Sequence, residues 1–227
     1  MKKETIIMSL GGSLIFPEEI DVKFLDKFRK LILKHIKKGK KFILITGGGK
    51  ICRKYQGAAK KIVNLSKEDL DWMGIKVTHM NAYFVKTLFR DFAYKDIIID
   101  PNVKIKTNKK IIVGGGWRPG CSTDFDAVLI AKNFKAKEMI NLTNMDYVYT
   151  KDPKKYKSAK IVKEMSWAQM RKIVGNKWEP GANLPFDPIA SKMAHDIGLK
   201  VIITNGKDLK NLDKIFSGKK FKGSVIE

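Results

Sequence analysis

Phe42-Ile43-Leu44-Ile45-Thr46-Gly47-Gly48-Gly49-Lys50 joins a short apolar run to three glycines and to a segment with helical spacing. The apolar run is typical of a buried strand. Glycine has no Cβ, so the backbone after this strand can approach a ligand closely. The free N–H groups and the positive dipole end of the following helix point at the same place. Lys50 and Arg53 add positive charge, so the unit predicts a site for phosphate or another anion.

The same arrangement occurs twice more in the chain. The strand-like run 6–10 leads into Gly11-Gly12-Ser13, and the run 111–113 leads into Gly114-Gly115-Gly116. One such junction is a weak signal, because tight turns also use glycine. Three junctions in one chain favour a shared ligand site. In an open parallel sheet, ligands bind at the carboxyl ends of the strands, where these loops would lie.

Length and composition indicate a globular protein, long enough for one large α/β domain or two small ones. The chain has 227 residues, of which 44% are hydrophobic, and we expect residues 1–227 to form a single domain. No apolar run approaches the roughly 18 residues that a membrane span needs, and the N-terminus lacks the features of a signal peptide. Cys52 and Cys121 form neither a disulfide framework nor a metal-ligand pattern. We therefore expect a cytoplasmic protein with no membrane partner and no metal site of its own.

The chain is strongly basic, with 46 Lys and Arg against 23 Asp and Glu and a formal net charge of +23. Such an excess can mark a nucleic-acid-binding protein. The lysines, however, fall in scattered pairs, and no RNA-binding aromatic motif accompanies them. We favour a lysine-rich solvated surface, with no specific nucleic-acid partner, that attracts anionic ligands in general.

Hydrophobic periodicity predicts an alternation of strands and helices, which is typical of an α/β fold with a mainly parallel sheet. Ser66 and the pair Thr123-Asp124 are expected to cap helices, and His35 to lie at a helix end. The segment 14–19 is expected to be a loop, and 154–163 to be charged and exposed. The predicted strands cover 6–10, 41–46, 97–99, 111–113, 138–142, 147–150, 201–203 and 223–226. The predicted helices cover 20–36, 50–63, 66–94, 124–134, 166–174, 187–197 and 208–216, with Gly175 and Pro180-Gly181 between the helices 166–174 and 187–197.

The common nucleotide motifs are missing. No G-x-x-x-x-G-K-[ST] occurs, which excludes a P-loop enzyme, and no G-x-G-x-x-G opens the first helix. Neither a Ser-His-Asp elbow nor a paired-cysteine metal site is visible. Several glycine loops, scattered cations and a few loop aspartates remain. This combination suits phosphoryl transfer, in which a protein mainly positions two substrates and neutralises charge.

These pieces follow one another in an order that resembles a known family. They are Gly11-Gly12-Ser13, Gly47-Gly48-Gly49-Lys50 with Arg53, Asp71 with Gly74-Ile75 and Asn81-Ala82, Gly115-Gly116 with Pro119-Gly120 and Ser122-Thr123-Asp124, Thr143-Asn144-Met145-Asp146 with Val148-Tyr149, Asp152-Pro153-Lys154-Lys155, and Asp187-Pro188 with Lys192. The order resembles the amino acid kinase superfamily and, within it, the archaeal-type UMP kinases. The resemblance covers nearly the whole chain. It implies a three-layer αβα sandwich with a central, mainly parallel sheet.

The resemblance also implies residue roles. It implies that ATP is bound by Ser9, Leu10, Gly11, Gly12, Ser13, Gly48, Arg53, Thr143, Asn144, Tyr149 and Asp152. It implies that UMP is bound by Gly47, Asp71, Trp117, Arg118, Pro119, Gly120, Cys121, Ser122 and Thr123. In this set Asp71 would bind the ribose hydroxyls. Lys192, Asp146 and Arg53 would act near the transferred phosphoryl group. Taken singly, Asp71, Tyr149 and Asp152 have ordinary structural explanations, as a surface helix residue, a core residue and a turn former, so the inference depends on their joint order.

The implied reaction transfers the γ-phosphoryl group of ATP to UMP and gives UDP and ADP. The attacking UMP phosphate oxygen has a second pKa of about 6, so it is largely ionised at neutral pH and needs no protein base. Backbone N–H groups, cations and the Mg²⁺ carried with ATP would offset the repulsion between the two polyanions.

Relatives form hexamers built from dimers. The helices over 20–38 and from 66 onward are the expected interface surfaces.

Several positions depart from the family pattern. Ser9 stands where many members have a lysine, His79 where an arginine is common, Trp117 where a small polar residue begins the acceptor loop, and Tyr147 where a glycine usually follows the aspartate. Lys50, Arg53 or Lys192 could supply the charge missing at Ser9.

Two alternatives to a UMP kinase therefore stay open. One is another small-molecule phosphate kinase of the same fold, for example one acting on isopentenyl phosphate. The other is a non-catalytic nucleotide sensor or RNA-binding regulator.

Overall fold

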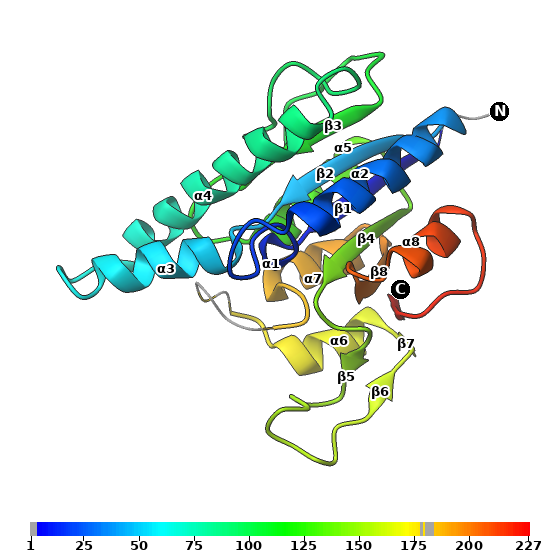
Figure 1. Cartoon of the computed structure of the whole chain (residues 1–227). Helices are drawn as coiled ribbons and strands as arrows, with labels where there is room; N and C mark the ends of the chain where they lie inside the picture. Colours follow the sequence, from blue (N-terminus) through cyan, green and yellow to red (C-terminus); the bar gives the residue numbers. More distant parts are fainter. Residues whose placement is uncertain (1–3, 178, 180–183) are drawn as a thin grey trace.

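The computed structural model describes residues 4–177, 179 and 184–227, and its helices and strands alternate along the chain (Figure 1). The strands are β1 (Thr5–Leu10), β2 (Lys41–Thr46), β3 (Ile111–Gly114), β4 (Glu138–Thr143), β5 (Val148–Tyr149), β6 (Ile161–Val162), β7 (Glu164–Met165), β8 (Lys200–Asn205) and β9 (Ser224–Ile226). The helices are α1 (Gly12–Ile15), α2 (Val22–Lys37), α3 (Gly49–Ala59), α4 (Lys67–Leu88), α5 (Thr123–Asn133), α6 (Trp167–Val174), α7 (Pro188–Asp196) and α8 (Leu209–Phe216).

One seven-stranded sheet with the order β3-β2-β1-β4-β8-β9-β7 forms the centre of the molecule. The neighbours from β3 to β8 are parallel, β9 runs antiparallel to β8, and β7 runs parallel to β9. The strands β5 and β6 form a separate antiparallel pair. The predicted mainly parallel sheet is therefore confirmed. The three strands that end in glycines, β1, β2 and β3, are neighbours, and their carboxyl ends lie at the same edge.

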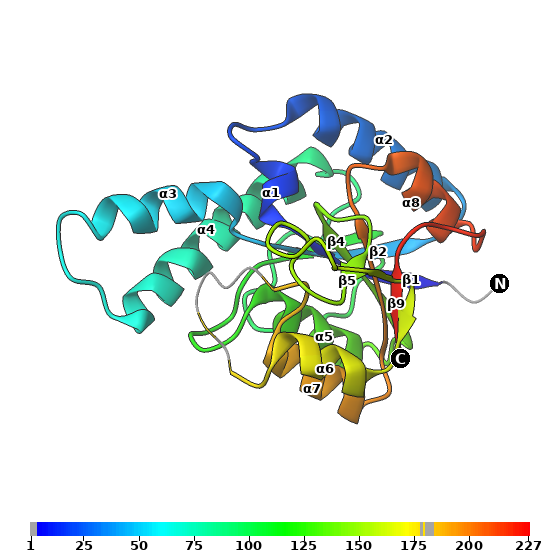
Figure 2. The ribbon, with the colours of Figure 1, turned by 90° about the horizontal axis from the view of Figure 1, so that it is seen from below.

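Alternate residues of each strand enter two separate cores, as the period of a strand requires. Met8 and Leu44 belong to the core under α1, α2, α8 and the C-terminal half of α4. Ile7 and Ile43 belong to the core under α5, α6 and α7. Figure 2 shows α2 and α8 on one side of the sheet and α5, α6 and α7 on the other. The chain is thus a three-layer αβα sandwich, as the resemblance implied.

Two helices leave the body of the sandwich. Helix α3 has no buried residue, and with the first turns of α4 it extends away from the sheet, so that the α3–α4 connection forms the far left end of the molecule in both views (Figures 1 and 2). Ser66 caps α4 as expected, with a full capping box. The Ser66 side chain accepts the Asp69 N–H, and the Asp69 side chain accepts the Ser66 backbone N–H. At α5 the cap is Ser122, one residue before the predicted pair.

Several predicted boundaries were wrong. The helix after Ser66 ends at Leu88 instead of continuing to position 94, because a turn follows it. The predicted strand 97–99 is only a single bridge between Ile98 and Gly114. Helix α1 occupies the start of the predicted loop 14–19.

Other predicted boundaries were too wide. The helix predicted over 50–63 ends at Ala59, and the strand predicted over 147–150 contains only Val148–Tyr149. The exposed segment 154–163 contains β6. Pro180-Gly181 lies outside the described residues. No helix in the described part of the chain is long and apolar enough to cross a membrane.

Candidate functional site

The first two glycine loops touch through their backbones. The Gly47 N–H donates to the Leu10 carbonyl oxygen at 2.9 Å. A Cβ on Gly12 would lie 2.3 Å from the Gly49 nitrogen and 2.4 Å from the Gly47 oxygen, so no larger residue fits there. Gly49 itself has a φ of +67°, which favours glycine. These contacts explain why both loops need glycine and place the starts of α1 and α3 side by side.

Helix α4 connects the second and third glycine loops. The Thr78 hydroxyl accepts the Gly116 N–H at 2.7 Å, and the Asn81 amide donates to the Gly47 oxygen at 2.8 Å. The Thr46 hydroxyl, at the end of β2, donates to the Thr78 oxygen at 3.0 Å. Loops from β2 and β3 therefore face each other across one side of α4.

A cavity of about 170 Å³ lies between these loops. Its lining combines apolar side chains with the charged groups of Arg53 and Asp71 and three hydroxyl groups, and these polar groups suit a phosphate ester. Six residues that the sequence assigned to nucleotides line it, two of them predicted for ATP. The lining residues are Gly48, Gly49, Cys52, Arg53, Gln56, Leu70, Asp71, Gly74, Ile75, Thr78, Gly116, Cys121, Ser122 and Thr123.

The loop after the third glycines, residues 117–122, is held by three aspartates from different elements. The Trp117 N–H donates to Asp126 Oδ2 at 3.1 Å, and the Gly120 N–H donates to Asp71 Oδ2 at 2.8 Å. The Ser122 N–H donates to Asp187 Oδ2 at 3.2 Å. Carboxylates on α5, on α4 and before α7 thus fix the start, the middle and the end of loop 117–122.

The middle of this loop does not line the cavity. Arg118 and Gly120 are exposed, and the Arg118 guanidinium lies 4.2 Å from the centre of the Trp117 ring. Pro119 lies between them and is half-buried. Gly120 has a φ of +86°. Of the residues predicted for UMP, Gly47, Trp117, Arg118, Pro119 and Gly120 do not line the cavity. Gly47, Trp117 and Gly120 are each adjacent in sequence to a residue that does.

Two carboxyl groups at the start of α5 carry raised pKa values. Burial raises the pKa of Asp124 to about 7 and that of Asp126 to about 8, and the nearby Asp187 adds to both shifts. The Ser9 hydroxyl donates to Asp124 Oδ1 at 2.8 Å. Ser9, where many family members have a lysine, is therefore buried and engaged with Asp124.

Apart from Gly48 and Arg53, which line the first cavity, the residues predicted for ATP lie at or beyond the ends of β1 and β4, which are paired strands. The Gly11 N–H donates to the Leu142 oxygen at 3.1 Å, so the first glycine loop adjoins the end of β4. At that end the Thr143 hydroxyl accepts the Met145 N–H, and Asn144 is exposed. A second cavity, of about 630 Å³, lies beyond. Its lining residues are Met145, Tyr149, Thr150, Lys151, Asp152, Pro153, Tyr156, Lys172, Ile173, Leu184 and Pro185.

The residues predicted to act on the transferred group lie apart. Arg53 lines the first cavity, Asp146 accepts a hydrogen bond from the Asn205 amide at 2.9 Å, and Lys192 is exposed on α7. Neither Asp146 nor Lys192 lines the first cavity. Lys50, a further predicted cation, pairs with Glu18 instead. Of these four charged side chains, Arg53 is therefore the one that the structure places in the cavity.

Sequence reasoning assigned no role to Thr78, Asn81 or Asp126 and did not predict the contact of Asp187 with Ser122, although Asn81 belongs to the motifs that carry the family resemblance. A signal existed for the first two. Thr78 lies seven positions after Asp71 and so on the same face of α4, and Asn81 lies one turn further on. For Asp126, the signal was an ionisable residue directly before the apolar run that continues α5.

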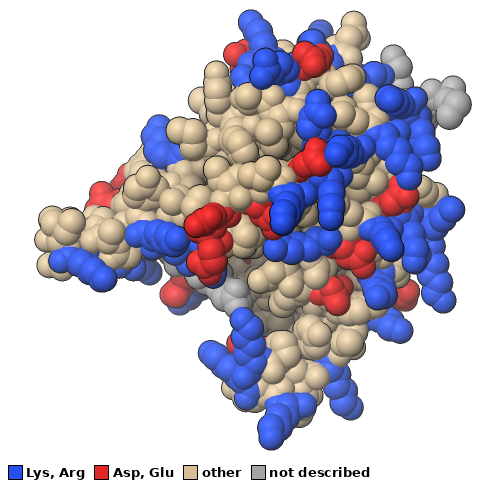
Figure 3. Space-filling model, in the orientation of Figure 1, with Lys and Arg blue, Asp and Glu red and all other residues tan. Residues whose placement is uncertain are grey.

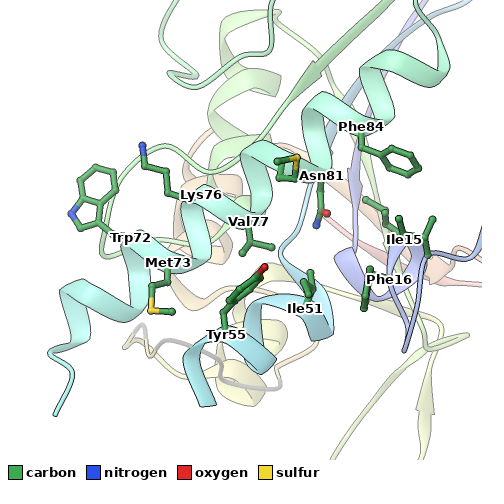
Figure 4. A pocket seen from close by; sticks show the side chains of 12 residues that line it. Ile15, Phe16, Ile51, Tyr55, Trp72, Met73, Lys76, Val77, Asn81 and Phe84 are labelled. Atoms are coloured by element: carbon green, nitrogen blue, oxygen red, sulfur yellow. The ribbon is translucent and has the colours of Figure 1, made fainter. Parts of the chain in front are cut away.

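A larger cavity of about 640 Å³ lies on the opposite face of α4 (Figure 4). Tyr55 of α3 and Val77 of α4 point toward one another there, beside Met73. Apart from Lys76, Asn81 and the hydroxyl of Tyr55, its lining side chains are apolar, so this groove does not suit a polyanion. The lining residues are Ile15, Phe16, Ile20, Ile51, Tyr55, Trp72, Met73, Lys76, Val77, Met80, Asn81 and Phe84.

Fold and site together define a class of protein. It has a parallel αβα sandwich whose glycine-tipped strands present backbone N–H groups and a polar cavity at one sheet edge, an arrangement suited to phosphorylated ligands. The model of the Amino acid kinase family matches residues 4–205.

Curated relatives agree with that match. The uridylate kinases of Pyrococcus abyssi and Methanobrevibacter smithii are each 32% identical to the chain, covering 98% and 97% of it and 99% and 98% of their own lengths. The crystal structure of uridylate kinase from Archaeoglobus fulgidus has a TM-score of 0.82 and 29% identity over 98% of this chain and 99% of that one. UMP kinase from Bacillus anthracis, at 18% identity and a TM-score of 0.77 over 99% of this chain and 96% of that one, shares the fold. The chain belongs to the amino acid kinase family.

Proposed function

We propose that the chain is an ATP-dependent UMP kinase that converts UMP and ATP to UDP and ADP. The observation that carries the proposal is the cavity of about 170 Å³, where Asp71, loop 117–122 and the second glycine loop meet. Full-length relatives named uridylate kinase support the same acceptor.

The acceptor is assigned to this cavity. Asp71 uses Oδ2 for the Gly120 N–H, which leaves Oδ1 for the ribose hydroxyls. The N-terminus of α3, where Gly48 and Gly49 line the cavity, offers backbone N–H groups to the phosphate, and Arg53 offers a cation. Ser122 and Thr123 add hydroxyls at the start of α5.

The donor is assigned to the neighbouring strand ends. Gly11, Gly12 and Ser13 would hold the ATP phosphates at the start of α1, and the cavity beside Tyr149 and Asp152 would take the adenosine. Because β1 lies between β2 and β4, the two nucleotides would approach each other phosphate to phosphate over the end of β1.

Catalysis would consist of positioning and charge neutralisation. The acceptor oxygen is already ionised near neutral pH, so no side chain has to remove a proton. In the described part of the chain, no group of three or more His, Cys, Asp or Glu side chains could hold a metal ion by itself. We propose that Mg²⁺ arrives on ATP, as is common for this ion, and neutralises phosphate charge. Asp146 at the end of β4 is the carboxylate we assign to that side of the site, and Lys192 remains a proposed cation.

A coupled assay of ADP release with a panel of acceptors tests this function. We expect UMP to exceed CMP, AMP and isopentenyl phosphate by at least about tenfold in kcat/KM, since a polar site rejects ligands that leave its buried groups unpaired. Equal rates with UMP and with buffer would refute the proposal. An isoprenoid acceptor would need an apolar pocket, and the apolar groove lies on the opposite face of α4 from the cavity lined by Asp71 and Arg53.

We also propose that copies of the chain assemble into dimers through the apolar groove and α3, and into a hexamer from those dimers. The groove exposes Met80, Tyr55 and Trp72, whose exposed fractions are 69%, 57% and 40%. Exposed large apolar side chains gathered in one groove on a projecting helix pair suggest an interface. We propose the cytoplasm as the compartment, in keeping with the two free cysteines.

A further inference from the structure

Asp126 holds the start of loop 117–122 from inside the protein. Its Oδ2 accepts the Trp117 N–H at 3.1 Å across nine residues of chain, and only 1% of Asp126 is exposed. Its Oδ1 is buried and has no hydrogen-bond partner among the described residues. A buried carboxylate with one oxygen unpaired is costly, so the position demands an explanation.

The surroundings of Asp126 favour its neutral form. Asp124 on its own helix, Asp187 before α7 and the thiol of Cys121 face it, while Arg118 is the cation nearby. Burial and the two aspartates raise the pKa of Asp126 to about 8, and the Trp117 N–H and Arg118 oppose that shift only in part. Asp126 is therefore mainly protonated at neutral pH and can accept the Trp117 N–H without placing a charge in the core.

Of the three aspartates that hold loop 117–122, Asp126 is the one that neither lines the cavity nor caps a helix. Asp71 lines the cavity and Asp187 also caps α7 by accepting the Ala190 N–H at 2.7 Å. Asp126 does not line the cavity. Its hydrogen bond closes the loop into a ring between Trp117 and the first turn of α5, which fixes the backbone of the exposed residues between them.

We propose that Asp126 is a positioning residue that holds loop 117–122 in the conformation that binds the acceptor nucleotide. This inference rests on the proposed function, because the acceptor is UMP. Ionisation of Asp126 would strengthen its hydrogen bond with the Trp117 N–H, but it would also bury a negative charge beside Asp124 and Asp187. Because burial is the largest cause of the raised pKa, opening of the loop to hydrate this charge would be favoured. The affinity for UMP should therefore fall as the pH rises through the pKa of Asp126, while the affinity for ATP should not change.

Two substitutions test the proposal by steady-state kinetics. Asp126→Asn keeps the size and the acceptor oxygen but cannot ionise, whereas Asp126→Ala removes the hydrogen bond. For the wild type we expect the KM for UMP to rise at least about threefold between about pH 7 and pH 9, and for Asp126→Asn we expect no such rise. For Asp126→Ala we expect a KM for UMP about tenfold higher at neutral pH, with kcat changed by less than about twofold. Asp26→Asn, an exposed aspartate on α2, is the matched control.

Amide hydrogen exchange of residues 116–122 in the nucleotide-free protein gives a readout that does not depend on turnover. We expect faster exchange in Asp126→Ala than in the wild type and in Asp126→Asn. If the wild type does not phosphorylate UMP but this difference holds, the proposed function fails and the role of Asp126 in the loop stands. If UMP is phosphorylated and Asp126→Asn retains the wild-type rise of KM with pH, the inference on Asp126 is overturned. That second comparison holds even if Asp126→Ala does not fold.

Discussion

Asp71, Asp126 and Asp187 come from three different elements, and each accepts one backbone N–H of loop 117–122. At the scale of single residues, this arrangement fixes the start, the middle and the end of the loop beside the cavity. It leaves Asp71 as the carboxylate of the three that lines the cavity, and therefore as the residue whose change should separate acceptor binding from donor binding.

Asp71→Asn should lower kcat/KM for UMP by at least about tenfold and leave the KM for ATP unchanged. The amide keeps one acceptor oxygen, but the other position becomes a donor and no longer accepts a ribose hydroxyl. Steady-state kinetics with each substrate varied in turn measure both values. Glu68→Gln, an exposed residue three positions earlier on α4, is the control. An unchanged KM for UMP in Asp71→Asn would contradict the assignment of the cavity.

Gly49→Ala should cost about 1–3 kcal/mol of unfolding free energy and most of the activity. Its φ is +67°, and a Cβ would lie 2.4 Å from the Gly12 carbonyl carbon, so the first two glycine loops would have to separate. Gly57→Ala in the same helix is the matched control, because nothing lies within 4 Å of its Cβ position. It should stabilise α3 by about 0.5–1 kcal/mol. Urea denaturation measures both, and a stable, active Gly49→Ala protein would refute the close contact of the loops.

Individual residues also show which parts of the site could be predicted from the sequence. The glycine loops were predictable, because strand, glycine and helix signals are local. The order of motifs also gave Asp71, Ser122 and Thr123, which line the cavity. The contact between Ser9 and Asp124 was not predictable, since it joins residues 115 positions apart. The burial of Asp126 likewise depends on how α5 packs on the sheet.

At the scale of elements, α4 has two working faces. One face lines the polar cavity through Asp71, Gly74 and Thr78, and the other lines the apolar groove through Met73, Val77 and Met80. The sequence predicted one long helix here but not its two roles, because polar and apolar residues alternate around it without a single stripe. The predicted strand 97–99 failed for a related reason, since β-branched residues also suit a loop that packs on the sheet edge.

Helices α2 and α8 are joined by a buried histidine that the sequence placed only at a helix end. His35 is 1% exposed, its Nε2 lies 2.7 Å from Asp213 Oδ1, and its ring contacts Phe216 edge to face at 5.2 Å. Burial lowers the pKa of His35 below its usual value, although Asp213 opposes the shift. The folded protein therefore binds a proton at His35 less readily than the unfolded chain does.

The sign of the pH effect follows. Below about pH 6.5 the unfolded chain gains a proton at His35 that the folded protein resists, so the contribution of His35 to stability is lost as the pH falls. His35→Gln removes this titration and should cost about 1–3 kcal/mol near pH 7 through lost packing. Urea denaturation of both proteins should show this difference shrinking between about pH 7 and pH 5.5. His195→Gln, an exposed histidine on α7, is the control. A difference independent of pH would contradict the account.

At the scale of the whole molecule, sheet order explains the site. The strands with glycine tips are neighbours in the order β3-β2-β1, and β4 follows, so loops from four strands meet at one edge. Lys and Arg side chains are spread over the face shown in Figure 3 and mixed with acidic ones, as the scattered pairs in the sequence predicted. The strand order itself was not predicted, since local patterns do not specify which parallel strands pair.

The apolar groove gives a prediction at this scale. Met80→Glu places a charge in the groove and should raise the dissociation constant of the proposed dimer by at least about tenfold, as expected for a central interface residue. Sedimentation velocity measures the change. Val103→Glu is the control, because Val103 is also exposed, at 55%, but lies outside the groove. A wild-type protein that stays monomeric, or a Met80→Glu protein with unchanged assembly, would refute this interface.

The most direct test is a crystal structure with UMP and a non-hydrolysable ATP analogue. We expect UMP in the cavity of about 170 Å³, with its ribose on Asp71 and its phosphate at the start of α3. The phosphates of the ATP analogue should lie along Gly11-Gly12-Ser13, pointing at that phosphate. UMP bound elsewhere, or two nucleotides whose phosphates do not meet over the end of β1, would contradict the claim that the glycine-tipped strands form one site.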